Sequence, residues 1–137
     1  MYKSFKQMPV WQSAMSAAEL VFQITDALPK KEDYGLTSQV RRSALSISAN
    51  IAEAFGREHT LEKINFYLVA RGSLTETQSH LDYGQRVGYF DVEEAHKLDL
   101  ALSDLHNDLN RLIRALKNTI RGKIGASTKT GSANTQP

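Results

Sequence analysis

A run of basic residues without a single acid, near the end of this 137-residue chain, is its best candidate for chemistry. Between Asn110 and Lys129 the sequence carries no Asp or Glu, and its bases are Arg111, Arg114, Lys117, Arg121, Lys123 and Lys129. Three of them, Arg114, Lys117 and Arg121, are spaced three and four residues apart, so on a helix their side chains share one face. A face of this kind can bind phosphate groups or an acidic partner.

The same charges also have a structural interpretation. The stretch from Asp91 to Asp108 holds six acids against one base, Lys97, so acids would lie at the start and bases at the end of a single helix. That order complements the helix dipole, and each charge near an end would stabilise the helix by roughly 0.3–1 kcal/mol. Both interpretations stay open, and the residues that would contact nucleic acid under the first are Arg111, Arg114, Lys117, Arg121 and Lys123.

A second polar group, Arg41, Arg42, Asn50 and Glu53, lies in a stretch with helical apolar spacing. The adjacent Arg41 and Arg42 are roughly 100° apart on a helix, so they cannot both face the same way. We expect one to pair with an acid such as Glu53 or Glu76 and the other to be exposed, with contact to a ligand or RNA as the alternative. Asn50 precedes a core position, where its amide can bridge two helices or fix their register.

The sequence carries no recognisable catalytic or cofactor signature. It has no P-loop, dinucleotide-binding glycine motif or nucleophile elbow, and the absence of cysteine excludes disulfides, thiolate catalysis and Cys-ligated metals. A di-iron site in a helical bundle needs two Glu-x-x-His motifs, and only Glu93 and His96 have that spacing. We therefore expect no enzyme activity, no cofactor and no metal, and a plain surface pair between Glu76 and His80.

Length and charge indicate one domain without general affinity for polyanions. A chain of 137 residues is one domain by length. Residues 122–137 hold Lys123 and Lys129 and no acid, which leaves 15 bases and 15 acids in residues 1–121. This body is formally neutral, so only a local basic patch can bind nucleic acid. No window has the roughly 20 uncharged residues of a membrane span, and we expect no membrane contact and a cytoplasmic location.

Apolar spacing predicts four helices. The first begins near Pro9 and ends before residues 29–35, and the second has Thr37 or Ser38 as N-cap and reaches Gly56. The core stripe of the second is Val40, Ala44, Ile47, Ile51 and Phe55.

The third helix covers about residues 61–87, its apolar stripe begins at Leu61 and ends at Val87, and it contains two glycines, Gly72 and Gly84. Mid-helix glycine costs roughly 1 kcal/mol relative to alanine, so we expect each to mark a close helix approach or a bend. The fourth helix starts at an Asp91 N-cap and continues as a heptad seam of Ala95, Leu98, Leu102, Leu105, Leu109, Leu112, Leu116 and Ile120.

These elements predict an all-α fold, an up-down four-helix bundle over residues 1–121. Residues 122–137 are mostly Gly, Ala, Ser, Thr and Asn, which cannot repay the entropy of ordering, so they are predicted to form a disordered tail. Leu100, Ile113 and Ile124 add apolar positions beside the seam. A second apolar strip suits a helix that meets both its own bundle and a neighbouring subunit.

The run Tyr34-Gly-Leu-Thr-Ser-Gln-Val-Arg-Arg, followed by Ala49-Asn-Ile-Ala-Glu, resembles the signature of the small bacterial proteins called 23S rRNA intervening-sequence proteins. Val10-Trp-Gln, Ala70-Arg-Gly-Ser-Leu-Thr-Glu and Val87-Gly-Tyr fit the same pattern. The resemblance covers most of the chain before residue 122.

The resemblance implies a four-helix bundle that assembles into a five-fold ring. It also implies kinship with accessory proteins of diversity-generating retroelements, which work beside a reverse transcriptase and RNA. The expected function is therefore a non-catalytic homopentameric scaffold that contacts nucleic acid or a nucleic-acid enzyme through a basic rim. The alternative is a purely structural or protein-binding homo-oligomer with no nucleic-acid role.

Overall fold

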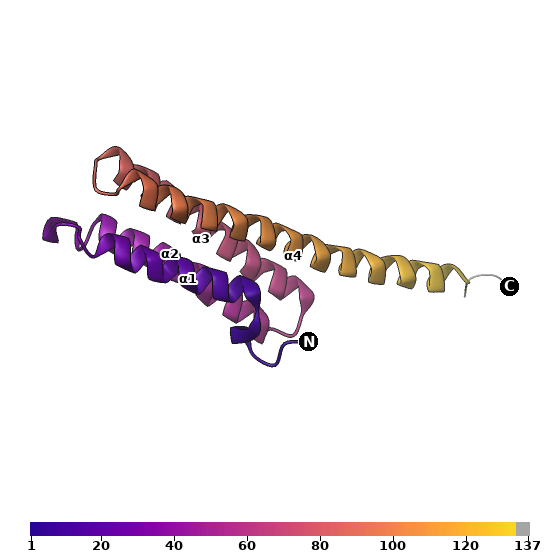
Figure 1. The fold of residues 1–137 in the computed structure, drawn as a ribbon. Coiled ribbons are helices and arrows are strands. Elements are labelled where there is room, and N and C mark those ends of the chain that lie inside the picture. Colours follow the sequence, from indigo (N-terminus) through magenta and orange to yellow (C-terminus); the bar gives the residue numbers. More distant parts are fainter. Residues whose placement is uncertain (134–137) are drawn as a thin grey trace.

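Four α-helices form a single up-down bundle in the computed structural model, which describes the backbone of residues 1–133 and the side chains of residues 1–125 (Figure 1). Each long helix packs against two others, in the order α1, α2, α3, α4 and back to α1, and α2 with α3 is the most extensive pair. The predicted all-α bundle is thus confirmed. The helices are α1 (Pro9–Thr25), α2 (Leu36–Gly56), α3 (Thr60–Arg86) and α4 (Val92–Ala133), with the short 3-10 helices η1 (Phe5–Gln7) and η2 (Lys30–Glu32) on either side of α1.

The predicted apolar stripes form the core. The stripe of α2 is buried from Val40 to Ile51, and the seam of α4 is buried from Ala95 to Leu109. Further along α4 the buried position is Ile113, because a helix with 3.6 residues per turn drifts away from a strict seven-residue repeat. The last predicted seam residues are only partly buried: Leu112, Leu116 and Ile120.

Glu32 joins two connections at one end of the bundle and caps α2. Its Oε2 accepts a hydrogen bond from the Tyr89 hydroxyl at 2.9 Å, and its Oε1 accepts one from the backbone N–H of Leu36 at 3.3 Å. The predicted N-cap, Thr37 or Ser38, is therefore wrong, because α2 already begins at Leu36. A carboxylate four residues before Leu36 thus has the capping role that we predicted for a hydroxyl.

The two glycines of α3 differ in their surroundings. A Cβ at Gly84 would lie 2.1 Å from Cε2 of Phe90, a buried ring in the turn before α4, so a close approach exists here as predicted. At Gly72 a close approach is absent within the described residues, since the position is exposed and a Cβ would meet nothing within 4 Å. The apolar stripe predicted for this helix is also wrong at its two ends, because Leu61 and Val87 are 66% and 49% exposed.

The fourth helix starts as predicted and ends later than predicted. Asp91 Oδ2 accepts a hydrogen bond from the backbone N–H of Glu94 at 3.2 Å, and α4 continues to Ala133. A helix that has already formed gains one hydrogen bond for each added residue. The sequence from Val92 to Ala133 contains no proline that would interrupt it. The predicted tail, 122–137, is thus helical as far as Ala133, and its last four residues lie outside the described part.

This extension leaves the bundle (Figure 1). Every side chain from Arg121 to Gly125 is exposed, and the helix runs past the ends of α1, α2 and α3. At 1.5 Å per residue the overhang from Arg121 to Ala133 is about 20 Å long.

Candidate nucleic-acid interface

The basic residues predicted to share a face do so on α4. Arg114, Lys117 and Arg121 lie within about 60° of one another around the helix axis, all three are exposed, and none forms a hydrogen bond or ion pair with a described residue. We call these three residues the basic stripe. They can therefore bind phosphate groups without first breaking a contact within the described part of the chain.

Two other predicted residues do not join the stripe. Arg111 Nη2 is paired with the Asp108 carboxylate three residues earlier, so its charge is partly neutralised. Lys123 is exposed, but it is two residues from Arg121 and thus about 160° away, on the other side of the helix.

Arg71 on α3 lies beside the basic stripe. It was not identified as a site residue from the sequence. Its Nη1 donates to Oδ1 of Asn110 at 3.0 Å, and Asn110 lies one turn before Arg114 on the same face of α4. The Asn110 amide nitrogen is in turn 3.2 Å from His106 Nδ1. No described acid pairs with Arg71, so α3 contributes a cation beside the stripe. Its only sequence signal is an arginine within an apolar stretch.

The dipole interpretation does not account for the stripe. Dipole effects fall off within the last turn of a helix, whereas α4 ends at Ala133 and its last turn holds no base. Arg121 is already three turns from that end, and Arg114 is five. The charges at the start of α4, Glu93 and Glu94, do lie in its first turn and suit the dipole there.

Arg41 has a structural role that differs from the predicted ion pair. Its Nε donates to Thr25 Oγ1 at 2.8 Å and its Nη2 to the Phe22 carbonyl at 3.3 Å, while the guanidinium lies 4.4 Å from the Phe22 ring centroid. The expected pairing with Glu53 or Glu76 is therefore wrong, because the end of α1 offers a hydroxyl and a carbonyl oxygen that each accept a hydrogen bond from the guanidinium. Arg42 is exposed, as the interpretation required of the second arginine.

Glu53 and Asn50 make contacts within α2. Glu53 pairs with Arg57 at 2.7 Å, and the Asn50 amide donates to the carbonyl of Ser46 at 2.7 Å and to its Oγ at 3.0 Å. Ser46 then meets Ser73 of α3 at 2.8 Å. Asn50 thus bridges the two helices only through Ser46.

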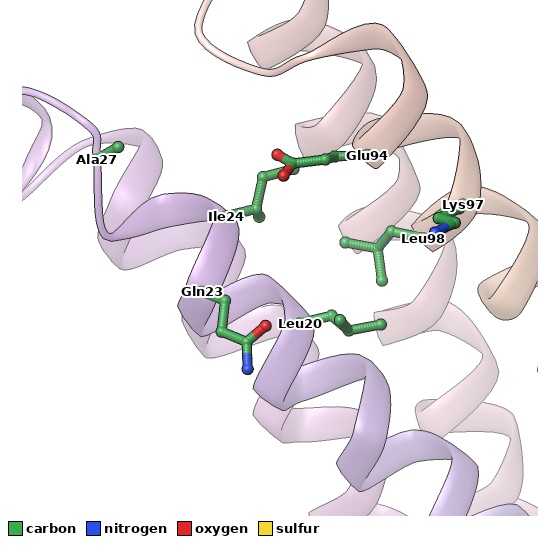
Figure 2. A pocket seen from close by; sticks show the side chains of 7 residues that line it. All are labelled: Leu20, Gln23, Ile24, Ala27, Glu94, Lys97 and Leu98. Atoms are coloured by element: carbon green, nitrogen blue, oxygen red, sulfur yellow. The ribbon is translucent and has the colours of Figure 1, made fainter.

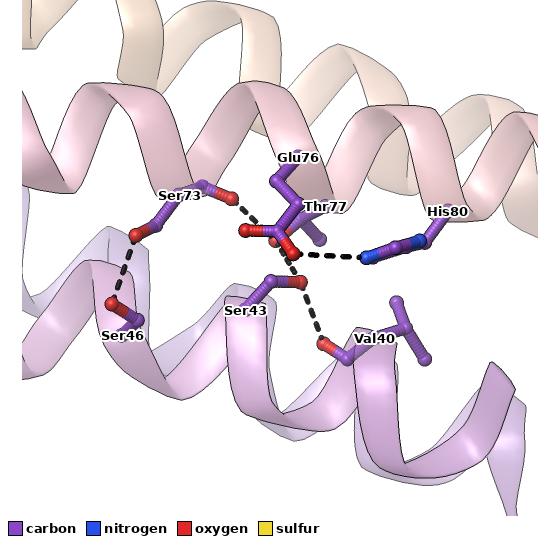
Figure 3. A network of polar contacts seen from close by, with 7 residues as sticks. All are labelled: Val40, Ser43, Ser46, Ser73, Glu76, Thr77 and His80. Carbon is purple, nitrogen blue, oxygen red and sulfur yellow. Dashed lines mark hydrogen bonds and ion pairs between the residues drawn. The ribbon is translucent and has the colours of Figure 1, made fainter. Parts of the chain in front are cut away.

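A row of small polar side chains holds α2 against α3 (Figure 3). Thr77 Oγ1 donates to Ser43 Oγ at 2.8 Å, and Ser43 Oγ donates to the Val40 carbonyl at 3.1 Å. Both hydroxyl residues are buried, so these bonds meet the need to pair buried polar groups. The predicted surface pair lies beside them, with His80 Nε2 at 3.2 Å from the Glu76 carboxylate. We interpret this network as packing, since its hydroxyls already have partners.

A groove lies between α1 and α4 (Figure 2). Its volume is about 420 Å³. Leu20 and Ile24 of α1 point toward Leu98 of α4 across it, and the remaining lining residues are Gln23, Ala27, Glu94 and Lys97. Apolar walls with a mixed polar rim suit a protein segment better than a phosphate.

No group of three or more His, Asp or Glu side chains in the described part is placed to hold a metal ion. The pKa of Tyr89 is raised above its ordinary value, first by the hydrogen bond to Glu32 and then by desolvation and nearby charge. Burial raises the pKa of Tyr67. Neither tyrosine is thereby made a better base or nucleophile. None of the helices, over their described residues, combines the length and the hydropathy needed to cross a bilayer.

The fold has solved relatives. A crystal structure from Bacteroides thetaiotaomicron, described as a protein of unknown function from the S23 ribosomal protein family, superposes with a TM-score of 0.69 at 23% identity and covers 76% of this chain and 97% of its own. That identity shows a shared fold and no more. No curated protein matches the chain.

The sequence itself matches a family model. Residues 6–111 match the family described as 23S rRNA-intervening sequence protein. The match spans most of the bundle and ends three residues before the basic stripe begins at Arg114. By this match the chain belongs to the 23S rRNA-intervening sequence protein family.

Proposed function

We propose that this protein is a non-catalytic scaffold that assembles with copies of itself and holds nucleic acid, or an enzyme that acts on nucleic acid, at the basic stripe of α4. The observation that carries the proposal is a set of exposed cations with no partner in the described part, on a helix that continues beyond the bundle. Neither the helix dipole nor a local ion pair accounts for them.

The distribution of charge along α4 supports the proposal. All 15 acids of the chain lie at or before Asp108, whereas 6 of its 17 bases follow Asn110. Residues 1–109 therefore carry 11 bases against 15 acids, a formal charge of −4, and residues 110–137 carry +6. A polyanion would be repelled by the body and attracted to one end, so it would bind in one orientation.

Exposed apolar side chains on the outer faces support self-assembly. Leu45 on α2, Val69 on α3 and Leu100 on α4 are each more than half exposed, at 56%, 51% and 52%. Contact with another copy would remove such surface from water. Five copies is the number that the family resemblance implies, and a ring of five would repeat the stripe around one rim.

The test is binding of a fluorescent RNA, measured by anisotropy at about 50 and 200 mM salt. Phosphate contacts weaken steeply over this range, and the triple variant Arg114→Glu, Lys117→Glu, Arg121→Glu should abolish binding. The matched control Lys30→Glu, Lys31→Glu, Lys97→Glu changes the net charge by the same amount at exposed positions away from the stripe, and it should retain most of the affinity. Equal loss in both variants would show that net charge alone drives binding.

A second function, protein binding without nucleic acid, is favoured by the groove between α1 and α4. Its leucine and isoleucine walls resemble the apolar grooves that receive a partner helix. If the unmutated protein binds neither RNA nor DNA at about 50 mM salt, where electrostatic association is strongest, this second function replaces the first.

A further inference from the structure

We infer that the basic stripe, together with Arg71, binds double-stranded nucleic acid in preference to single strands, through phosphates alone. This inference rests on the proposed function and adds the form of the nucleic acid. It draws on what the surface around the stripe contains and on what it lacks.

Single strands are usually held by aromatic side chains on which bases stack, at about 1–3 kcal/mol per base. The stretch from residue 110 to the end contains no Phe, Tyr or Trp. The most exposed aromatic side chain, Tyr34 at 97%, lies between η2 and α2, and Glu32 of η2 is hydrogen-bonded to Tyr89 just before the start of α4, far from the stripe. Phe22 lies in the last turn of α1, and Arg41 stacks on one face of its ring. The segment of α4 that carries the stripe therefore offers a single strand no aromatic ring for stacking.

Tyr2, an exposed aromatic residue near the N-terminus, does not extend the surface. It precedes η1, which packs against α1 and α2 and makes no contact with α4 in the described part. The stripe faces away from the core of α4. Base stacking thus has no platform on the part of α4 that carries these cations.

The cations themselves match a stiff, densely charged partner. From Arg114 to Arg121 the stripe extends about 10 Å along a straight helix, and Arg71 adds a fourth cation from α3, held by Asn110. Duplex DNA presents one phosphate charge per about 1.7 Å of its axis and is already ordered, whereas a flexible single strand has a lower charge density. The three side chains of the stripe are exposed, and α4 then runs past the other helices (Figure 1), so a rigid duplex has room to lie alongside.

The size of the preference follows from counterion release. Four neutralised phosphates give a slope of log affinity against log salt of about −3.6 for a duplex and about −2.8 for a single strand. If the two forms bind equally at 1 M salt, the difference in slope makes the duplex about tenfold tighter at 50 mM. Both numbers can be measured without knowing the natural target.

The experiment measures anisotropy of labelled 20-base-pair duplexes of RNA and of DNA, and of unstructured 20-nucleotide single strands of each, from about 50 to 300 mM salt. We expect either duplex to bind about tenfold tighter than its single strand at 50 mM, with a slope near −3.6. A larger effect with one duplex identifies whether RNA or DNA is the source of the phosphates. Single strands that bind as tightly as duplexes would overturn this inference and leave the proposed function standing, whereas no binding of any form would end both.

Arg71 provides the residue-level test. Arg71→Gln keeps a donor for Asn110 and removes the charge, so the duplex slope should become shallower by about 0.9, and affinity at 50 mM should fall about 15-fold. Lys97→Gln, an exposed base on the same helix as the stripe, should leave the slope unchanged. Circular dichroism on each sample establishes that the fold is retained. An unchanged slope in Arg71→Gln would exclude Arg71 from the surface.

Discussion

Replacing Gly84 with alanine tests the close packing of Phe90 against α3. The new Cβ would lie 2.1 Å and 2.5 Å from two carbon atoms of the Phe90 ring, where ordinary carbon contacts are about 3.5–4.0 Å. The ring is 5% exposed and has to leave its site. Loss of a buried phenylalanine costs about 3–5 kcal/mol, and the helix propensity of alanine returns about 1, so the free energy of unfolding should fall by about 2–4 kcal/mol.

Gly72 supplies a matched control in the same helix. It is exposed with open space around it, so Gly72→Ala should raise the free energy of unfolding by up to about 1 kcal/mol. Urea unfolding at one fixed protomer concentration measures both variants, since self-association makes stability depend on concentration. In a Phe90→Ala background the Gly84→Ala change should become stabilising, because the clash is gone. Stabilisation by Gly84→Ala in the unmutated background would refute the packing of Phe90 against α3.

Three further predictions concern the bundle and its assembly. Truncating Leu105 or Leu109, which are 1% and 0% exposed, to alanine should cost about 2–5 kcal/mol in urea unfolding, and a change below about half a kcal/mol would contradict their place in the seam. Light scattering coupled to size exclusion should show a multimer, whereas a monomer at micromolar concentration would remove the ring and the shared rim. Deleting residues 126–137 should leave thermal unfolding and oligomeric state unchanged, and loss of assembly would show that this segment docks on a neighbour.

Periodicity made the core of the bundle predictable. The stripe of α2 and the seam of α4 follow from spacing alone, because a helix buries one face and the apolar side chains on that face repeat every three to four residues. The same rule fails at helix ends. Leu61 and Val87 continue the pattern of α3, yet they are exposed, since the neighbouring helices no longer cover a residue so close to a terminus.

Contacts between helices were less predictable, because they depend on register and side-chain length. The sequence suggested an acid as the partner of Arg41. In the structure its guanidinium instead donates to a hydroxyl and a carbonyl oxygen at the end of α1. Arg71 donates a hydrogen bond to Asn110, 39 positions away, and no local sequence pattern predicts such a pair. The length of α4 was missed for a different reason: composition argued for disorder, while helix propagation depends on hydrogen bonds already formed.

The like charges of the basic stripe destabilise α4. A single substitution can therefore test whether the stripe serves binding rather than the fold. Three other exposed arginines each have an acid three or four residues before them, namely Arg57, Arg86 and Arg111. Lys117 instead has Arg114 three residues before it and Arg121 four residues after it, two like-charge pairs that are each destabilising by about 0.2–0.5 kcal/mol.

Lys117→Glu converts both repulsive pairs into attractive ones, so it should raise the free energy of unfolding by about 0.8–2 kcal/mol at low salt. The same change removes a cation from the middle of the stripe, so affinity for duplex nucleic acid should fall and its salt dependence should become shallower. Urea unfolding and anisotropy on the same sample measure the two effects. Because α4 continues to Ala133, the acid would meet no unfavourable dipole at position 117. A variant that is less stable and binds as before would show that Lys117 serves the fold and that the stripe is not the interface.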